Sequence, residues 1–136
     1  MTPAGYSGTP LAQKLGLKDG FRVLLIAQPK DYAELLGPAA KSLAFVRKAG
    51  PSVDLVHLFV SARKELAAQL EKLRSSLRSE VPIWVSWPKK ASKLPTDITE
   101  DVIREVALPM GFVDIKVCAV TEVFSGLKLV VRKELR

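Results

Sequence analysis

Six short apolar runs alternate with amphipathic or irregular segments along the chain. They are rich in Val, Ile, Leu and Phe, and they predict strands over residues 21–27, 43–46, 53–60, 81–87, 112–120 and 127–133. The first run is apolar at nearly every position, which is typical of a strand covered on both faces in a parallel sheet. The second run is the shortest and the weakest of these predictions.

Several of the intervening segments predict helices. In one of them, leucines one turn apart form an apolar stripe with charged residues opposite, and Ser61 offers an N-cap before it. In another, Asp97 followed three residues later by Glu100 predicts a capping box. With two shorter helices added, we expect helices over 10–15, 32–36, 62–78 and 97–108.

This alternation predicts an α/β fold, a compact three-layer sandwich around an open, mostly parallel six-stranded sheet. We expect one domain over 1–136, in which 1–20 form an irregular lead-in and a short helix. The link at 122–126 is too short for a parallel crossover, so the last two strands should form an antiparallel hairpin. The link at 47–52 is also short. Either the strand at 43–46 is a marginal edge strand, or this link runs extended beneath the sheet with no helix.

The composition is that of an ordinary globular protein with a basic balance. The 136 residues carry a net charge of +7, with 48% hydrophobic and 26% charged residues. The positive charge is spread along the chain, which favours a solvated basic surface; the alternative is a footprint for phosphates or acidic ligands. Cys118 is the only cysteine, so no intrachain disulfide can form. No run reaches the roughly 18 apolar residues of a membrane span, and the first residues contain no apolar signal segment. We therefore expect a cytoplasmic protein without membrane contact.

Several blocks of sequence carry a resemblance that extends over nearly the whole chain. They include GYSG at 5–8, YAELLG at 32–37, the distinctive WVSWPKK at 84–90 and SGLKLVV at 125–131. These blocks resemble the bacterial family called domain of unknown function 3052. That family name carries no activity, so the resemblance implies a small cytoplasmic bacterial protein and little more.

A wider resemblance is to the Rossmann-like fold of S-adenosylmethionine-dependent methyltransferases. Residues 18–24 resemble the first strand of that fold with its lead-in, 53–56 resemble its fourth strand, and 109–112 resemble the approach to its C-terminal hairpin. The resemblance implies the strand order 2-1-3-4-6-5, with the last strand antiparallel.

The glycine-rich cofactor motif of that fold is missing from this chain. Such enzymes have a Gly-rich turn after the first strand, and an acidic residue after the second strand holds the ribose. Here the first turn is AQPK at 27–30, and the second strand is followed by Arg47 and Lys48. We therefore do not expect S-adenosylmethionine in its usual pose, and the identity of any cofactor stays open.

Ligands of doubly wound sheets bind outside the carboxyl ends of the strands, which points to the loops at 28–32, 61–63 and 86–93. The last of these loops places an indole beside two lysines, which can stack a flat ring and meet phosphates or carboxylates. The predicted ligand-binding residues are Gln28, Asp31, Tyr32, Ser86, Trp87, Lys89 and Lys90, with Tyr6 and Ser7 as a lid. The alternative is that Trp87 covers the sheet edge and the lysines are solvated.

The sequence predicts neither a catalytic constellation nor a metal site. His57, the only histidine, alternates with apolar residues in a predicted strand, which favours a neutral, hydrogen-bonded buried side chain over a catalytic base. Cys118 is expected to be a small core residue, and one cysteine with one histidine does not predict zinc. No serine lies in a nucleophile elbow, and there is no P-loop.

These observations favour a binding protein over an enzyme. We expect a degenerate or non-enzymatic Rossmann-like protein that binds a small anionic or nucleotide-like ligand at the carboxyl ends of its strands. Three alternatives stay open. One is association with nucleic acid through the basic surface, with Trp87 as a stacking platform. Another is an active transferase with an atypical cofactor pose. The third is an interaction protein, such as a homodimer formed through the exposed sheet edge.

Overall fold

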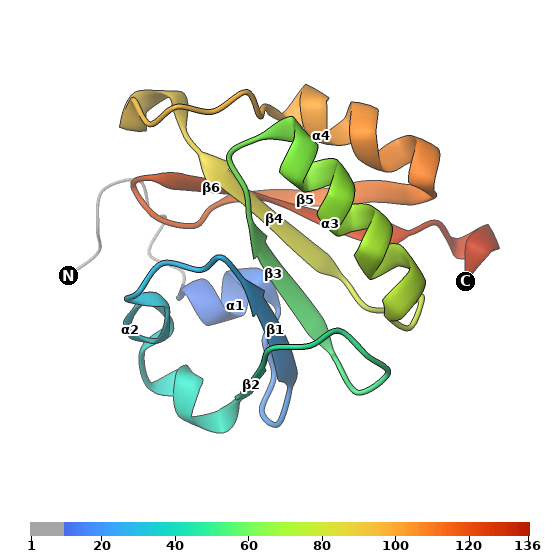
Figure 1. The fold of residues 1–136 in the computed structure, drawn as a ribbon. Helices are drawn as coiled ribbons and strands as arrows, with labels where there is room; N and C mark the ends of the chain where they lie inside the picture. The colour runs from blue at the N-terminus through green and yellow to red at the C-terminus, as the bar shows by residue number, and fades with distance from the viewer. Residues whose placement is uncertain (1–9) are drawn as a thin grey trace.

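The computed structural model describes residues 10–136 and places six strands in one sheet, in the order β2-β1-β3-β4-β6-β5 (Figure 1). Strands β1 to β4 run parallel, and β6 lies antiparallel to both β4 and β5. The strands are β1 (Arg22–Ile26), β2 (Ala44–Val46), β3 (Leu55–Phe59), β4 (Ile83–Pro88), β5 (Phe112–Ala119) and β6 (Phe124–Val131). The predicted fold class, strand order and antiparallel last strand are confirmed.

Helices form a layer on each face of this sheet (Figure 1). The short helices α1 (Leu11–Leu15) and α2 (Tyr32–Leu36) cover one face, whereas α3 (Arg63–Ser76) and α4 (Glu100–Ala107) cover the other. Short 3₁₀ segments follow α2, β4, α4 and β6. None of the helices within residues 10–136 has the length and apolar character needed to span a membrane.

The central strands are buried on both sides, as their apolar runs predict. Every residue of β3 and β4 is buried. Because successive side chains of a strand point to opposite faces, Val56 and Leu58 join the core beneath α3 and α4, while Leu55 and Phe59 join the core beneath α1 and α2. The face on which a side chain lies therefore decides which of the two cores it enters.

The connection from β2 to β3 departs from the usual pattern of a parallel sheet. β2 is an edge strand of three residues that pairs in parallel with β1, and residues 47–54 reach β3 without a helix. The explanation by a marginal edge strand is therefore confirmed, whereas the link has no helix but forms bends and turns and is not extended. A parallel crossover usually contributes a helix, so the layer of α3 and α4 lacks a helix that this crossover would provide.

The predicted helix caps are wrong: the cap of α4 lies two residues after the predicted one, and Asp97 bonds to the start of α3 instead. Thr99, not Asp97, caps α4: its Oγ1 accepts a hydrogen bond of 3.2 Å from the backbone N of Val102. Asp97 Oδ1 instead accepts a hydrogen bond of 2.6 Å from the backbone N of Arg63, the first residue of α3. The N-cap position of α3 lies one residue after Ser61, whose side chain does not cap it. Asp97 thus links the segment before α4 to the start of α3, where the helix dipole stabilises a negative charge.

β6 begins at Phe124, earlier than predicted, because Gly126 belongs to the strand and not to the turn. A Cβ on Gly126 would lie 2.9 Å from Val120 Cγ2 and 3.3 Å from Trp84 Cε3. Close packing, and not turn geometry, therefore requires glycine at this position. The hairpin turn comes just before Phe124 and is closed by Thr121 Oγ1, which accepts hydrogen bonds from two backbone amides.

Candidate functional site

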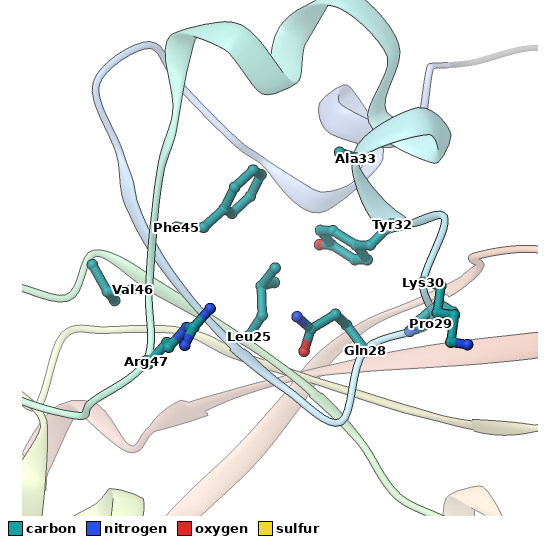
Figure 2. A pocket seen from close by; sticks show the side chains of 9 residues that line it. All are labelled: Leu25, Gln28, Pro29, Lys30, Tyr32, Ala33, Phe45, Val46 and Arg47. Atoms are coloured by element: carbon teal, nitrogen blue, oxygen red, sulfur yellow. The ribbon is translucent and has the colours of Figure 1, made fainter.

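A pocket of about 450 Å³ lies where β1 and β2 end (Figure 2). We call it the β1–β2 pocket. Its lining comes from β1, the turn after it, the start of α2, and the end of β2, and consists of Leu25, Gln28, Pro29, Lys30, Tyr32, Ala33, Phe45, Val46 and Arg47. The carboxyl ends of neighbouring parallel strands are the usual place for a ligand in a doubly wound sheet.

Two aromatic rings form the apolar part of this pocket. Tyr32 and Phe45 meet edge to face, with ring centroids 6.2 Å apart and an interplanar angle of 82°. Tyr32 is buried, whereas Phe45 is 40% exposed, an unusual exposure for a phenyl ring. Figure 2 shows the ring of Phe45 pointing toward Tyr32 across the pocket. This exposed ring offers a surface against which a flat group can stack.

The polar part of the pocket is cationic. In Figure 2, Arg47 and Gln28 point toward one another across the pocket, while the amine of Lys30 points away from it. The Arg47 side chain is exposed and forms no hydrogen bond or ion pair with another residue in 10–136. No acidic side chain lines the pocket within this described range. A guanidinium with all its donors available, beside an amide that can donate and accept, matches an anionic or polar ligand.

A buried chain of hydrogen bonds lies beneath the pocket. Tyr32 Oη is 2.7 Å from His57 Nδ1, and His57 Nε2 is 2.6 Å from Ser86 Oγ. His57 also stacks on Phe59, with centroids 4.4 Å apart. Burial lowers the pKa of His57 to about 3 and raises the pKa of Tyr32 above its usual value. The imidazole is therefore neutral and the phenol protonated near pH 7, which confirms the prediction of a neutral, hydrogen-bonded buried histidine.

The His57–Ser86 end of this chain is closed to solvent, whereas Tyr32 borders the pocket. His57 and Ser86 are both fully buried, so neither an attacking water nor a substrate reaches them from solution. Ser86 was expected to contact a ligand, and that expectation is not met. β4 continues through Pro88 and keeps Ser86 in mid-strand, opposite Gly126 of β6. Its hydroxyl contacts the ring of His57 inside the protein.

The structure does not gather the other predicted site residues into one place. Gln28 and Tyr32 line the β1–β2 pocket. Trp87 is only 6% exposed and packs in the core beneath α3 and α4, on the opposite face of the sheet from Tyr32. Burial prevents the indole from acting as a stacking platform for either a small ligand or a nucleic acid. Lys89 and Lys90 follow β4 and line neither this pocket nor its rim.

The remaining predicted positions lie elsewhere. Asp31 lines a separate cavity of about 360 Å³ with Leu35 and Phe124. Tyr6 and Ser7, the proposed lid, are outside the described residues. Cys118 was predicted to be a core residue. It is half-buried at the side of the α1–α2 core. No group of His, Cys, Asp or Glu side chains suited to a metal ion occurs in 10–136.

The turn that replaces the glycine-rich motif has an unusual backbone. Ala27, directly after β1, has a φ of 56°, in the left-handed region that favours glycine. An alanine in this conformation costs about 1–2 kcal/mol. The turn thus keeps a backbone conformation suited to glycine but carries a methyl group there.

Sequence reasoning missed Phe45 and Arg47 as site residues. Phe45 lies in the strand that was the weakest prediction, and Arg47 was noted only as a departure from an acidic residue. The signal that could have found them is topological. In the order 2-1-3-4-6-5 the ends of β1 and β2 are neighbours, so the first residue after β2 must lie beside the turn after β1.

Comparison with known proteins identifies the fold but not the activity. No family model matches the chain, and no curated protein does, so the resemblance to domain of unknown function 3052 stays a prediction. Solved structures do match. A putative type 11 methyltransferase from Sulfolobus solfataricus superposes with a TM-score of 0.63 at 14% identity, covering 90% of each chain. The chain has the Rossmann-like fold of S-adenosylmethionine-dependent methyltransferases.

Two further structures show the same fold. A SAM-dependent methyltransferase from Aquifex aeolicus has a TM-score of 0.62 at 13% identity, covering 90% of this chain and 88% of that one. Magnesium protoporphyrin IX methyltransferase from Synechocystis PCC 6803, solved with bound SAM, has a TM-score of 0.61 at 15% identity, covering 90% and 74%. At such identities the likeness concerns the fold alone.

Proposed function

We propose that this protein binds an anionic, nucleotide-like ligand in the β1–β2 pocket. The observation that carries the proposal is that Arg47 and Phe45 line one pocket at the carboxyl ends of two parallel strands. The guanidinium of Arg47 has no partner within residues 10–136, and the ring of Phe45 is exposed. The base of the ligand stacks on Phe45, its polar edge meets the amide of Gln28, and its phosphate or carboxylate pairs with Arg47.

The residues do not fit S-adenosylmethionine held in the usual way. The ribose of that cofactor needs a hydrogen-bond acceptor after β2, and Arg47 and Lys48 carry only donors. The cofactor also bears a sulfonium cation, which a cationic pocket disfavours. After β1, Ala27 puts a methyl group where a glycine would let the cofactor approach the backbone.

A second candidate is an active transferase that holds S-adenosylmethionine in an atypical pose. It is favoured by the solved structures above, whose titles describe methyltransferases, one of them with bound SAM. The two candidates differ in the charge of the preferred ligand, so a binding panel separates them.

The test is isothermal titration calorimetry of the purified chain with AMP, ATP, NADP⁺, S-adenosylmethionine and S-adenosylhomocysteine. The first proposal expects one or more of the phosphate-bearing nucleotides to bind more tightly than S-adenosylmethionine. Arg47→Ala should weaken that binding about 10- to 100-fold, since a charged hydrogen-bonded pair contributes about 1.5–3 kcal/mol.

Lys48→Ala is the matched control, because it removes the neighbouring positive charge outside the pocket. If it weakens binding as much as Arg47→Ala does, the ligand does not occupy this pocket. Tighter binding of S-adenosylmethionine than of the nucleotides supports the second candidate and overturns the first. Binding of none of the five compounds overturns both.

A further inference from the structure

A second and larger hollow lies on the α3 side of the β1–β2 edge. It has a volume of about 610 Å³, and we call it the α3 groove. The partly buried Ile26 and Ala49 form its accessible apolar floor, above the buried side chains of Leu24 and Leu73. The cationic side chains of Arg47, Lys48 and Lys72 stand around it. It touches the β1–β2 pocket only at Leu25 and Arg47, so its other residues can be changed without altering that pocket.

The groove exists because the crossover from β2 to β3 has no helix. Residues 47–54 make the connection as an irregular chain, so one flank of α3 has no neighbouring helix among the described residues. Gln69, Lys72, Leu73 and Ser76 line the groove from α3. Their spacing of i, i+3, i+4 and i+7 is one face of a helix, and it extends along the axis for about 10 Å. The hollow therefore has the position and the bordering surface of a missing helix in the layer.

The charge of the groove indicates what could fill it. The side chains of Arg47, Lys48 and Lys72 are exposed, and none forms a hydrogen bond or ion pair with another residue in 10–136. Over the same range, no acidic side chain lines the groove. An occupant that matches this surface has an apolar stripe for the floor and carboxylates on either side for the rim.

We propose that the α3 groove docks an acidic amphipathic helix of a partner protein, which takes the place of the absent crossover helix. Such a helix packs beside α3 at an interaxial distance of about 8–10 Å and buries its apolar stripe on the partly buried Ile26 and Ala49. A single-stranded nucleic acid fits less well, because no aromatic side chain of residues 10–136 lines the groove to stack its bases. The proposal stands independently of the ligand in the β1–β2 pocket.

The probe is a synthetic, N-acetylated and C-amidated helix of about 16 residues, with leucines at i, i+3, i+4 and i+7 and glutamates on the flanks. A second peptide of the same composition has its leucines scattered around the helix. Fluorescence anisotropy gives the affinity of each for the full chain, and ¹⁵N-NMR of the labelled chain locates the contact. The amphipathic peptide should bind at least about tenfold more tightly than the scattered one, with shifts concentrated at the groove residues. Its affinity should fall as salt is added.

Variants decide whether the groove is the site. Lys48→Glu with Lys72→Glu should weaken the amphipathic peptide by roughly tenfold or more. Lys41→Glu with Lys64→Glu is the matched control, because it changes the net charge equally at exposed positions outside the groove. The proposal is overturned by any of three results: equal binding of the two peptides, equal loss in the two double variants, or shifts away from the groove. Displacement of the peptide by a short oligothymidylate at equal concentration also overturns it, in favour of a nucleic-acid site.

Discussion

The buried histidine makes the stability of the fold depend on pH in a predictable way. In the native chain His57 has its pKa lowered to about 3, and its ordinary value is 6.5. Between these values the unfolded chain binds a proton that the folded chain does not. The contribution of His57 to stability is therefore fully present above pH 6.5 and is lost progressively as the pH falls toward about 3.

The size of the loss follows from the two pKa values. Each pH unit in the window removes about 1.4 kcal/mol, which amounts to about 2.5 kcal/mol between about pH 7 and about pH 4.5. For a chain of 136 residues, that loss lowers the melting temperature by about 9 °C. Comparison with a chain that lacks the imidazole isolates this contribution.

Thermal unfolding of the wild-type chain and of His57→Gln over this pH range makes that comparison. Glutamine keeps a donor and an acceptor between Tyr32 and Ser86 but does not titrate. The variant should be less stable near pH 7, and its melting temperature should fall less steeply with acid. Because His57 is the only histidine, ¹⁵N-NMR of the wild-type imidazole gives an independent measurement that does not require the variant to fold. An imidazole that titrates near pH 6.5 in the folded chain would refute the reasoning.

Two glycine-related positions give further predictions. Ala27→Gly should raise the free energy of unfolding by about 0.5–1 kcal/mol, because glycine adopts the left-handed conformation of this turn without strain. The greater conformational freedom of glycine in the unfolded chain offsets part of this gain. Urea denaturation measures the change, and a loss of stability would contradict the left-handed conformation of residue 27. Gly126→Ala should lower the same free energy by about 1–3 kcal/mol, since its Cβ would press on Val120 and Trp84. Gly50→Ala is the control for crowding, because nothing lies within 4 Å of its Cβ, and equal losses in the two variants would show that packing is not the cause.

Much of the fold could be predicted because its signals are local. The apolar runs at 53–60 and 81–87 are long enough to mark buried parallel strands, and the short link before β6 dictates a hairpin. The bond that satisfies the start of α3 could not be predicted in the same way. Asp97 bonds to Arg63, which is distant in sequence, and no pattern along the chain distinguishes this contact from the local capping box that Asp97 and Glu100 suggest.

The structure separates the predicted residues of the loop after β4 from Gln28 and Tyr32 for a related reason. Neighbouring residues of a strand point to opposite faces, so Ser86 and Trp87 enter different cores as long as β4 continues. The basic residues that follow suggested that the strand ends at Trp87, whereas it continues through Pro88. A shift of one residue at a strand end is enough to change an exposed indole into a buried one, and sequence patterns seldom fix strand ends to that accuracy.

Two departures from the methyltransferase pattern, in contrast, were visible in the sequence: the turn after β1 has no glycine, and a basic residue follows β2. The strand order shows how the two are related in space. Ala27 directly follows β1 and Arg47 directly follows β2, and these strands are hydrogen-bonded neighbours in the sheet. The two departures therefore lie at one edge of the sheet. A carboxylate after β2 would accept hydrogen bonds from ribose hydroxyls, whereas a guanidinium can only donate. Replacing the acceptor by a donor reverses the charge that this edge prefers in a ligand. A fold shared with S-adenosylmethionine-dependent enzymes is thus compatible with a preference for phosphate-bearing ligands, and the ligand panel with Arg47→Ala tests that reversal directly.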